Sequence, residues 1–339
     1  MGQPEAQASI ETFAKRVASL DATANRALVN AFAPVYAELQ RDIRLLLRQA
    51  NREGLTPVQT TRLIRYRRLE TNLLRNISRF VDAAGTSITQ AQLEATGLAQ
   101  LASRTTASAA LPEGVSLEML ARVGGRWQDV PTEAFTNFVG IAGDGQPVGN
   151  LLANLGGETA ARVKNQIGSG ILLGKNPRVV ADLIRTNAGL PLSKALTIAR
   201  TETLRAYRES SRLQYAANSD IVKGYARLAT KDPRTCIACI ALDGKLYELN
   251  EPLDSHPNCR CALVPETITY RDLGLDVDMP EREPNAESWL GGLSTDKQRN
   301  ILGNARYEQW SKGKPLTDFV QIKESPIWGK SATVAPIGG

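Results

Sequence analysis

Five side chains that can bind a transition metal lie close together in this chain of 339 residues. They are its four cysteines and its single histidine, arranged as a C-x-x-C pair, a spacer and an H-x-x-C-x-C segment: Cys236, Cys239, His256, Cys259 and Cys261. Structural Zn²⁺ sites usually have four cysteine or histidine ligands, supplied as two close pairs from two turns. The spacing therefore predicts one structural zinc ion per chain, with five candidate ligands for four positions.

The sequence leaves open which four side chains bind the metal. Cys259 and Cys261 point to the same side if their segment is extended, which favours four thiolates. His256 can instead replace one thiolate, or form a hydrogen bond to a ligand. Two disulfides and four reduced thiols are the alternatives to zinc, and a reducing cytoplasm disfavours disulfides. Four protein ligands leave no open position for a substrate, so a zinc ion held in this way would be structural.

Sequence patterns for catalysis are weak in this chain. A zinc deaminase needs H-x-E upstream of P-C-x-x-C, whereas here the order is reversed and no glutamate follows His256 in that pattern. A phosphate-binding G-x-x-x-x-G-K-[ST] loop is absent from the sequence. Glu202 and Glu209 are a candidate carboxylate pair, but Arg205 between them has the spacing of ion pairs on a helix surface. We therefore expect no enzyme activity.

Arginine is concentrated between residues 41 and 80, a stretch that contains only three acidic residues. Such a surface can bind DNA phosphates, bind an acidic protein surface, or form a solvated helix face. The candidate residues for nucleic-acid or partner binding are Arg41, Arg44, Arg48, Arg62, Arg65, Arg67, Arg68 and Arg75.

Helices are predicted over most of the first 105 residues, because apolar residues recur there at spacings of three and four. Gly54 predicts the end of one helix, and Thr56 with Pro57 predicts the start of the next. The two would pack as a helical hairpin. No apolar stretch reaches the roughly 18 residues of a membrane-spanning helix, and the first residues lack the pattern of a signal peptide.

The pattern changes after residue 220. Residues 222–230 predict a strand, and residues 240–249 predict a β-hairpin with Asp243 and Gly244 in its turn. The predicted fold class is α+β, with a mainly α-helical N-terminal body, a small cysteine-rich, zinc-type β-module and a helical C-terminal tail.

The combination of these motifs resembles the phage Mu F-like minor capsid (head morphogenesis) proteins. The resemblance covers roughly residues 150–265, and Tyr225 departs from it, since relatives often have tryptophan there. It rests on A-R-T-E at 199–202, D-P-R-T-C-I-A-C at 232–239, L-D-G at 242–244 and H-P-N-C-R-C at 256–261. A weaker likeness in the tail involves Trp289, Gln298, Ile301, Leu302, Gly303, Tyr307, Trp310 and Gly313.

The resemblance implies a low-copy component of a tailed bacteriophage head, made in the host cytoplasm and carried in the virion. The implied partners are the phage portal protein, the major capsid or scaffold protein and double-stranded DNA; no membrane is implied, and the protein can be an oligomer. The implied structural motif consists of Arg200, Thr201, Glu202, Asp243 and Gly244, with Arg200 and Glu202 bracing their helix against the cysteine module through separate partners. The alternatives are a virion-delivered nuclease or transferase, and a DNA-binding zinc-module protein outside any particle.

With the resemblance included, the sequence predicts five regions along the chain. They are a helical hairpin at 1–105, an irregular connection at 106–149, a Mu F-like domain at 150–265 with its Cys/His module at 221–265, an acidic linker at 266–287 and a helical tail at 288–339.

Overall fold

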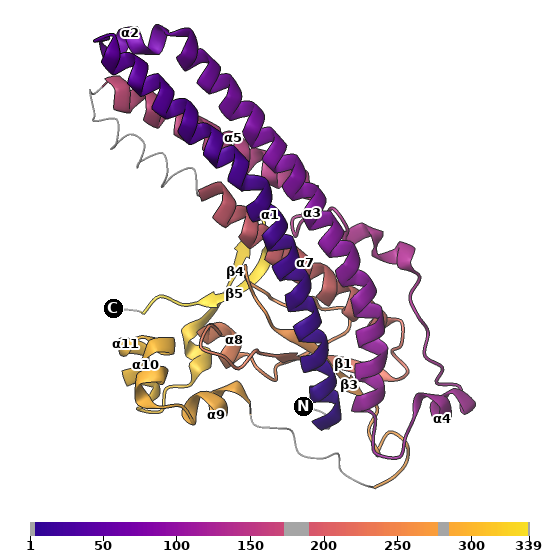
Figure 1. Cartoon of the computed structure of the whole chain (residues 1–339). Helices are drawn as coiled ribbons and strands as arrows, with labels where there is room; N and C mark the ends of the chain where they lie inside the picture. Colours follow the sequence, from indigo (N-terminus) through magenta and orange to yellow (C-terminus); the bar gives the residue numbers. More distant parts are fainter. Residues whose placement is uncertain (1–3, 173–189, 277–284, 338–339) are drawn as a thin grey trace. The chain divides into compact units, whose positions relative to one another are not determined.

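The computed structural model describes residues 4–172, 190–276 and 285–337 (Figure 1). The elements of the N-terminal part are α1 (Pro4–Arg52), α2 (Pro57–Arg62), α3 (Ile64–Ala110), α4 (Leu117–Arg122), the 3-10 helix η1 (Thr132–Phe138), α5 (Val148–Leu172) and α7 (Leu190–Ala216). Those that follow are β1 (Val222–Leu228), α8 (Ile237–Ala241), β2 (Leu246–Tyr247), β3 (Ala262–Thr267), α9 (Ala286–Gly291), α10 (Thr295–Leu302), α11 (Asn304–Trp310), η2 (Leu316–Phe319), β4 (Val320–Ser325) and β5 (Gly329–Val334). The α+β class and the helical N-terminal part are as predicted. Among the described helices, none is both long enough and apolar enough to cross a membrane.

The chain divides into two compact units, which share the long helices α1 and α3. Unit 1 consists of Met1–Leu20, Gln92–Val139 and Thr201–Gly339, and unit 2 of Asp21–Ala91 and Gly140–Arg200.

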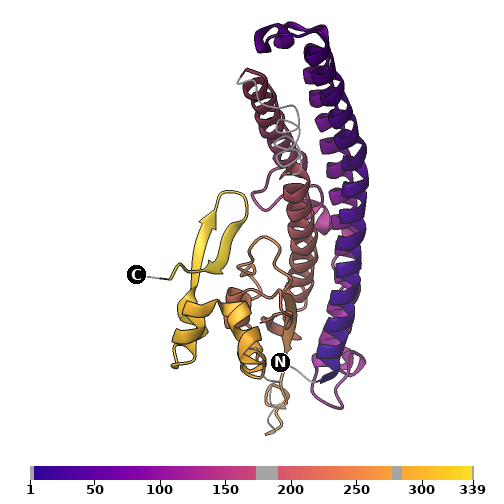
Figure 2. The ribbon, with the colours of Figure 1, turned by 60° about the vertical axis from the view of Figure 1, so that its left-hand side comes forward.

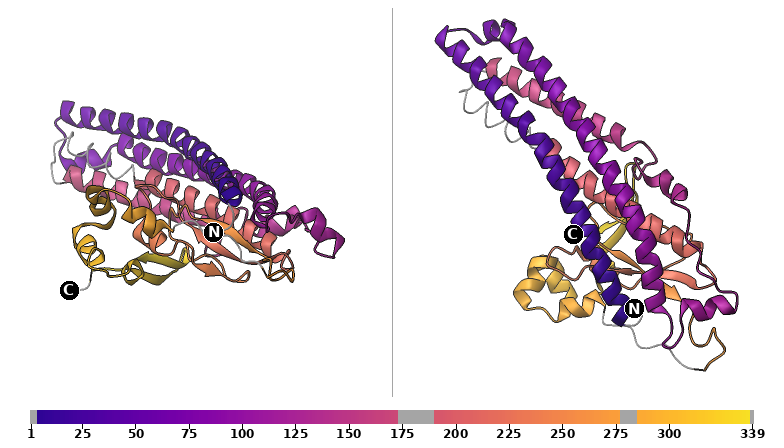
Figure 3. Two further views of the ribbon diagram at one scale, coloured as in Figure 1. Left: turned by 90° about the horizontal axis from the view of Figure 1, so that it is seen from below. Right: turned by 45° about the vertical axis from the view of Figure 1, so that its right-hand side comes forward.

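Unit 2 is built on three helices that lie side by side in both views of Figure 3. Its core contains Leu39, Ile43 and Leu46 of α1, Leu69, Leu73 and Ile77 of α3, and Ala160 and Val163 of α5. In α1 and α3 the core positions recur at spacings of three and four, as expected for helices that each bury one face.

The connection between α1 and α3 contains the predicted helix end near Gly54 and the predicted helix start at Thr56 and Pro57. Gly54 has a φ of 58°, and the Leu55 amide donates to the carbonyl of Ala50 (3.0 Å). Thr56 caps α2 in a capping box with Gln59, and Pro57 opens the helix. These contacts reverse the chain between α1 and α3, which form the predicted hairpin.

Unit 1 contains an antiparallel sheet in the order β2-β1-β3. Buried side chains of the sheet, of α8 and of the C-terminal elements form one core, which includes Tyr225, Ile240, Leu290 and Phe319. Cys239, Cys259 and Cys261 belong to the same core. Three of the five candidate metal ligands are therefore part of the hydrophobic interior of this unit.

The β-hairpin predicted over residues 240–249 is wrong. Residues Ile237–Ala241 form α8, and β2 pairs with β1, with Tyr225 opposite Tyr247, so the chain turns at Asp243 and Gly244 without a local strand pair. The physical reason is the cap: the Cys236 sulfur accepts a hydrogen bond from the Cys239 amide and starts a helix in a short apolar run. Such runs do not distinguish helix from strand by their period.

The C-terminal tail is helical over α9, α10 and α11, and it also contains two strands that the sequence did not predict. Strands β4 and β5 form an antiparallel hairpin (Figure 2). Two hydrogen bonds attach this hairpin to the segment before His256: Ala332 N to Asp254 O (3.1 Å) and Ser331 Oγ to Ser255 O (3.0 Å). The acidic linker expected at 266–287 begins with the last two residues of β3, and its part at 277–284 lies outside the described residues.

Two adjacent glycines of α5 allow a test of the packing in unit 2. A Cβ atom at Gly156 would lie 2.9 Å from Val81 Cγ2 and 3.0 Å from Ile77 Cγ2, whereas one at Gly157 would have no neighbour within 4 Å. We expect Gly156→Ala to destabilise the protein by about 1–3 kcal/mol, because the β-branched side chains of Val81 and Ile77 have few other rotamers and cannot easily move away from the added methyl group. Gly157→Ala should be neutral or stabilising by up to about 1 kcal/mol. Urea denaturation of both variants tests this, and equal stabilities would contradict the α3–α5 packing.

Candidate metal centre

The first pair of candidate ligands lies at the start of α8. Cys236 is the N-cap residue, and its Sγ accepts from the Cys239 amide at 3.4 Å. Cys239 follows one turn later and is buried, while Cys236 is half-buried. The C-x-x-C spacing therefore places both sulfurs at the same end of one short helix.

The second group of ligands is carried by a tight turn. The Cys259 amide donates to the carbonyl of His256 (3.0 Å), and Asn258 has a φ of 63°. Proline followed by a residue with positive φ is the pattern of a type II turn, and asparagine tolerates that conformation better than most residues. The turn places His256 and Cys259 beside each other, and Cys261 follows immediately before β3.

All five predicted ligands come together. His256 Nε2 lies 3.1 Å from Cys236 Sγ and 3.2 Å from Cys239 Sγ, and Cys239 Sγ lies 3.8 Å from Cys259 Sγ. The donor atoms of Cys236, Cys239 and His256 lie within 4.8 Å of one another, as do those of Cys239, Cys259 and Cys261. With zinc–sulfur bonds of about 2.3 Å, sulfurs of a tetrahedral site are about 3.8 Å apart. The cluster therefore has the dimensions of a zinc site, and its four cysteines are not paired as disulfides.

The histidine is oriented for metal binding. Its Nδ1 lies 2.8 Å from the carbonyl oxygen of Pro257, which can only accept a hydrogen bond. This contact assigns the proton of the neutral ring to Nδ1 and leaves the lone pair of Nε2 facing the two thiols.

The pKa values of the cysteine thiols differ. The hydrogen bond from Cys239 holds the pKa of Cys236 at about 4, and a hydrogen bond from Cys239 also lowers the pKa of Cys259 well below its usual range. Cys239, which donates these bonds, has a raised pKa for the same reason. Thiolates are the form of cysteine that binds metal.

There is little free space at the cluster. The cavity lined by Cys236, Cys239, His256 and Cys259 has a volume of ≈ 20 Å³. That is room for a water molecule or an ion, whereas small-molecule sites are typically of about 300–1,000 Å³. The geometry suits a bound ion and does not suit a substrate.

Helix α7 contacts the turn that carries the second group of ligands. Thr201, one of the predicted motif residues, accepts a hydrogen bond from the Asn258 amide (3.0 Å). Arg208, two turns further along, donates to the carbonyl of Cys259 (3.1 Å) and to Ser255 Oγ (3.3 Å). Arg208 is not among the residues predicted from the sequence; its spacing of seven from Thr201, which places both on one helix face, is the signal that could have found it.

The other motif residues have separate roles. Arg200 forms an ion pair with Asp21 of α1 (2.8 Å), and Glu202 forms one with Arg205 (2.7 Å). Glu202 is fully buried, so its pairing with Arg205 is not the surface pair that the spacing suggested. Thr201 supplies one bracing contact from this motif to the cysteine module.

Asp243 and Gly244 form the turn before β2. The two carboxylate oxygens of Asp243 accept from the backbone amides of Ala229 (2.6 Å) and Ala286 (2.7 Å), and Gly244 has a φ of 81°. Asp243 thereby connects β1, the turn and α9.

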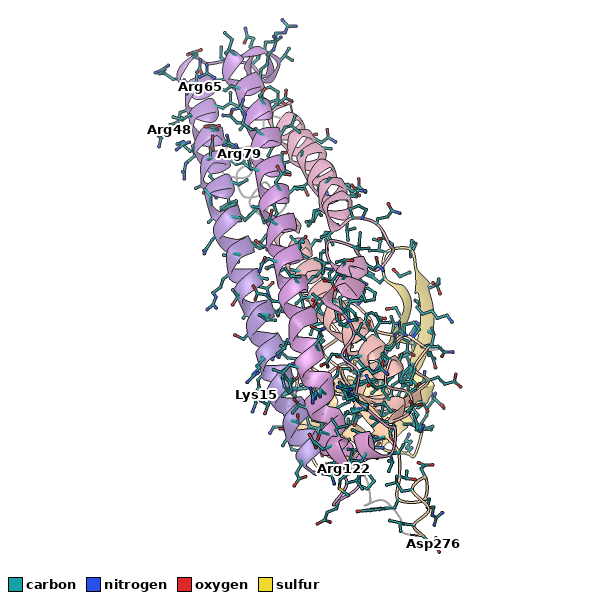
Figure 4. The ribbon with its side chains drawn as sticks, turned by 90° about the vertical axis from the view of Figure 1, so that its right-hand side faces the viewer. Lys15, Arg48, Arg65, Arg79, Arg122 and Asp276 are labelled. Carbon is teal, nitrogen blue, oxygen red and sulfur yellow. The ribbon has the colours of Figure 1, made fainter. Side chains whose placement is uncertain are left out.

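The arginine candidates lie in unit 2, on α1 and α3 and at the end of α2, and all eight are exposed. Arg41, Arg44, Arg48 and Arg52 are spaced by three and four residues, so they share one face of α1. Figure 4 labels Arg48 of α1 and Arg65 and Arg79 of α3 near the turn that joins these helices.

The two ligand-bearing segments are joined by an ion pair that can be tested. Arg260 contacts both oxygens of Asp232 (2.5 and 2.8 Å), and these hydrogen bonds hold the pKa of Asp232 well below its usual range. We expect Asp232→Asn to lower the free energy of unfolding at pH 7 by about 1–3 kcal/mol. Because the pKa of Asp232 is lower in the folded protein than in the unfolded chain, where it is about 3.9, the ionised side chain stabilises the fold above that pH. The difference in stability between wild type and Asp232→Asn should therefore shrink as the pH falls below about 4.

Arg234→Gln is the matched control, because Arg234 is 82% exposed and lies 3.6 Å from the same carboxylate. We expect it to change stability by less than about 0.5 kcal/mol. Urea titrations of both variants at several pH values measure these differences, and a pH-independent deficit in Asp232→Asn would contradict the assignment.

A comparison with known protein families matches the part of the chain that contains the cysteine cluster. The family model described as Phage Mu protein F like protein matches residues 161–264, which include Thr201, Arg208 and all five candidate ligands. No curated protein and no solved structure gives a significant match. The matched segment, and with it the cysteine cluster, therefore belongs to the Phage Mu protein F-like family.

Proposed function

We propose that this chain is a minor capsid, or head morphogenesis, protein of a tailed bacteriophage. The observation that carries the proposal is the family match over the segment that contains the cysteine cluster. The small cavity at that cluster supports a structural role over catalysis by a virion-delivered nuclease or transferase. On this proposal the protein binds the portal protein, or the major capsid or scaffold protein, during head assembly, packaging or genome delivery.

The first test is the composition of the particle. Mass spectrometry of purified virions should detect this chain at low copy number, and gene deletion should reduce the yield of filled heads. Virions that lack the chain, with normal yield after its deletion, would contradict the proposal. A phenotype reproduced by substituting Glu202 and Glu209 alone, in a folded protein, would favour the enzyme alternative.

We propose that the cluster binds one structural Zn²⁺ through Cys236, Cys239, His256 and Cys259. The short distances, from His256 Nε2 to the sulfurs of Cys236 and Cys239 and from Cys239 Sγ to Cys259 Sγ, all join atoms of these four residues. The lone pair of His256 Nε2 is also available to a metal, because the ring proton lies on Nδ1. Four cysteines with His256 outside the set are the alternative. In either case the ion would stabilise the module by joining α8 to the turn before β3.

Elemental analysis of the purified protein should find about one zinc per chain, and the double variant Cys236→Ser, Cys239→Ser should lose it. His256→Ala should weaken zinc binding by more than Cys261→Ser if the proposed set is correct, and the reverse order would indicate four thiolates. A metal-free, fully folded wild-type protein would contradict a zinc site of either kind.

A second function, binding of double-stranded DNA, is favoured by the arginines of unit 2. Between residues 41 and 80 every basic residue is an arginine, and the candidates are exposed. Of the three acidic residues there, Asp42 accepts from Asn72 (3.0 Å) and Glu53 pairs with Arg52 (3.4 Å). Phosphates of a duplex are spaced regularly along its axis, and a stripe of arginines at one helix face can contact several of them.

The triple variant Arg41→Gln, Arg44→Gln, Arg48→Gln should weaken DNA binding and reduce the slope of log K against log salt by up to about 3. The charge-matched control Lys15→Gln, Arg122→Gln, Lys312→Gln, at exposed positions of unit 1, should have a smaller effect. Fluorescence anisotropy with a labelled duplex measures both. If binding to DNA is absent at low salt, or if the two triple variants behave alike, the arginines have another role.

A further inference from the structure

The C-terminal tail, residues 285–337 of unit 1, lies outside the family-matched segment, which ends at residue 264. It nevertheless contacts both parts of the chain that carry candidate metal ligands. The first ligand-bearing segment is residues 236–241, with Cys236 and Cys239, and the second is residues 254–261, with His256, Cys259 and Cys261. The tail is therefore a candidate part of the metal centre.

Helix α8, in the first ligand-bearing segment, needs tertiary contacts to be ordered. It has five residues, and an isolated helix of that length is not stable in water. The elements packed most closely against α8 are α9, η2, β4 and β5, all of which belong to the tail. Leu316 and Phe319 of η2 are buried in the same hydrophobic core as Ile240 of α8. The tail therefore positions the first pair of ligands.

A hydrogen bond also attaches the tail to the chain just after α8. The amide of Ala286, the first residue of α9, donates to the carboxylate of Asp243, which lies two residues beyond the end of α8 (2.7 Å). Asp243 is 8% exposed and Ala286 is 0% exposed, so water competes little for this bond.

The second ligand-bearing segment is bonded to β5 of the tail. The Ser331 hydroxyl donates to the carbonyl of Ser255 (3.0 Å), and the Ala332 amide donates to the carbonyl of Asp254 (3.1 Å). Ser331 is 3% exposed and Ala332 is 0% exposed. Because Ser255 immediately precedes His256, these bonds hold the backbone at the start of the ligand-bearing turn.

These contacts bear on how a bound ion would leave. An ion held by ligands from both segments can be released only when one segment moves away from the other. Such local opening has its own free energy, which includes every contact that must break. Movement of either segment would break contacts with the tail, so the tail makes opening less frequent.

We propose that the C-terminal tail is a clamp on the metal centre, which holds the two ligand-bearing segments together and slows release of the ion. This inference rests on the proposed zinc site. Leu316 and Ser331 are positioning residues in this scheme, because neither is a candidate ligand and each holds one ligand-bearing segment. Coupling between two binding events is reciprocal, so the bound ion should in turn stabilise the docked tail.

The first test compares two hydroxyl groups of β5. Ser331→Ala removes the bond to Ser255, whereas Thr333→Val removes a hydroxyl that bonds within the β4–β5 hairpin, to the carbonyl of Gln321 (3.4 Å). Ser331→Ala should increase the rate of zinc release to saturating chelator by about 3- to 10-fold, because one buried hydrogen bond no longer opposes opening. Thr333→Val should leave the rate within about 1.5-fold of wild type, because its bond is long and does not involve a ligand-bearing segment.

The second test compares two buried leucines. Leu316 is 0% exposed and lies in the core that includes α8, and Leu69 of α3 is 1% exposed and lies in the core of unit 2. Leu316→Ala should increase the rate of zinc release by more than about 10-fold, because it leaves a cavity in the packing that positions α8. Leu69→Ala makes the same truncation in the other unit and should leave the rate within about twofold of wild type. If Leu316→Ala does not fold, Ser331→Ala and Thr333→Val carry the comparison.

Hydrogen exchange tests the reciprocal effect. Amides of β5 should exchange more slowly in the zinc-bound protein than after chelation, whereas amides of α1 in unit 2 should exchange alike in both states. This readout does not depend on any substitution.

Equal rates of zinc release in Ser331→Ala and Thr333→Val, or β5 amides that exchange alike with and without zinc, would overturn the clamp and leave the zinc site intact. A wild-type protein that contains no zinc and takes up none would contradict the zinc site itself, and the clamp with it.

Discussion

The contact between helix α7 and the turn at residues 255–259 is the interaction on which the candidate metal centre depends. Thr201 accepts a hydrogen bond from the amide of Asn258, and Arg208 donates one to the carbonyl of Cys259. One helix face therefore fixes the backbone on both sides of Asn258, the residue with positive φ. A positive φ costs asparagine more than it costs glycine, and the surrounding hydrogen bonds stabilise Asn258 in this conformation. His256 and Cys259 therefore face the thiols of α8 because α7 defines the backbone between them.

This arrangement explains why the C-terminal part of the chain belongs to the same core. The β4–β5 hairpin bonds to Asp254 and Ser255, on the other end of the ligand-bearing segment, and α9 is attached to the Asp243 turn through the amide of Ala286. The ligand segment is thus bonded to α7 and to the C-terminal hairpin. Metal binding would add a connection to α8, within a region that is already hydrogen-bonded and apolar.

The sequence predicted those features that depend on local spacing. Two pairs of ligands, a helix start at Thr56 and a turn at Asp243 and Gly244 can be inferred from a few neighbouring residues. The structure contains the helix start and the turn as predicted, and it brings the ligands together. The sequence did not predict the features that depend on contacts between residues far apart in the chain. Ile237–Ala241 is too short for its period to exclude a strand, and β2 pairs with β1 instead of its neighbour in sequence. Arg208 and Glu202 have the sequence pattern of surface residues, and only the tertiary structure reveals their burial.

The two charged features of the molecule require different physical explanations. The arginines of unit 2 are exposed, and water and salt screen their charge, so their attraction to a polyanion is sensitive to ionic strength and adds little to the stability of the fold. Arg208 and Arg227 are buried in unit 1, where screening is weak, so their charge bears directly on the stability of the fold. Because the two sets lie in different compact units with separate cores, a substitution in one set need not disturb the packing around the other. A loss of DNA binding and a loss of metal can therefore be assigned to separate causes.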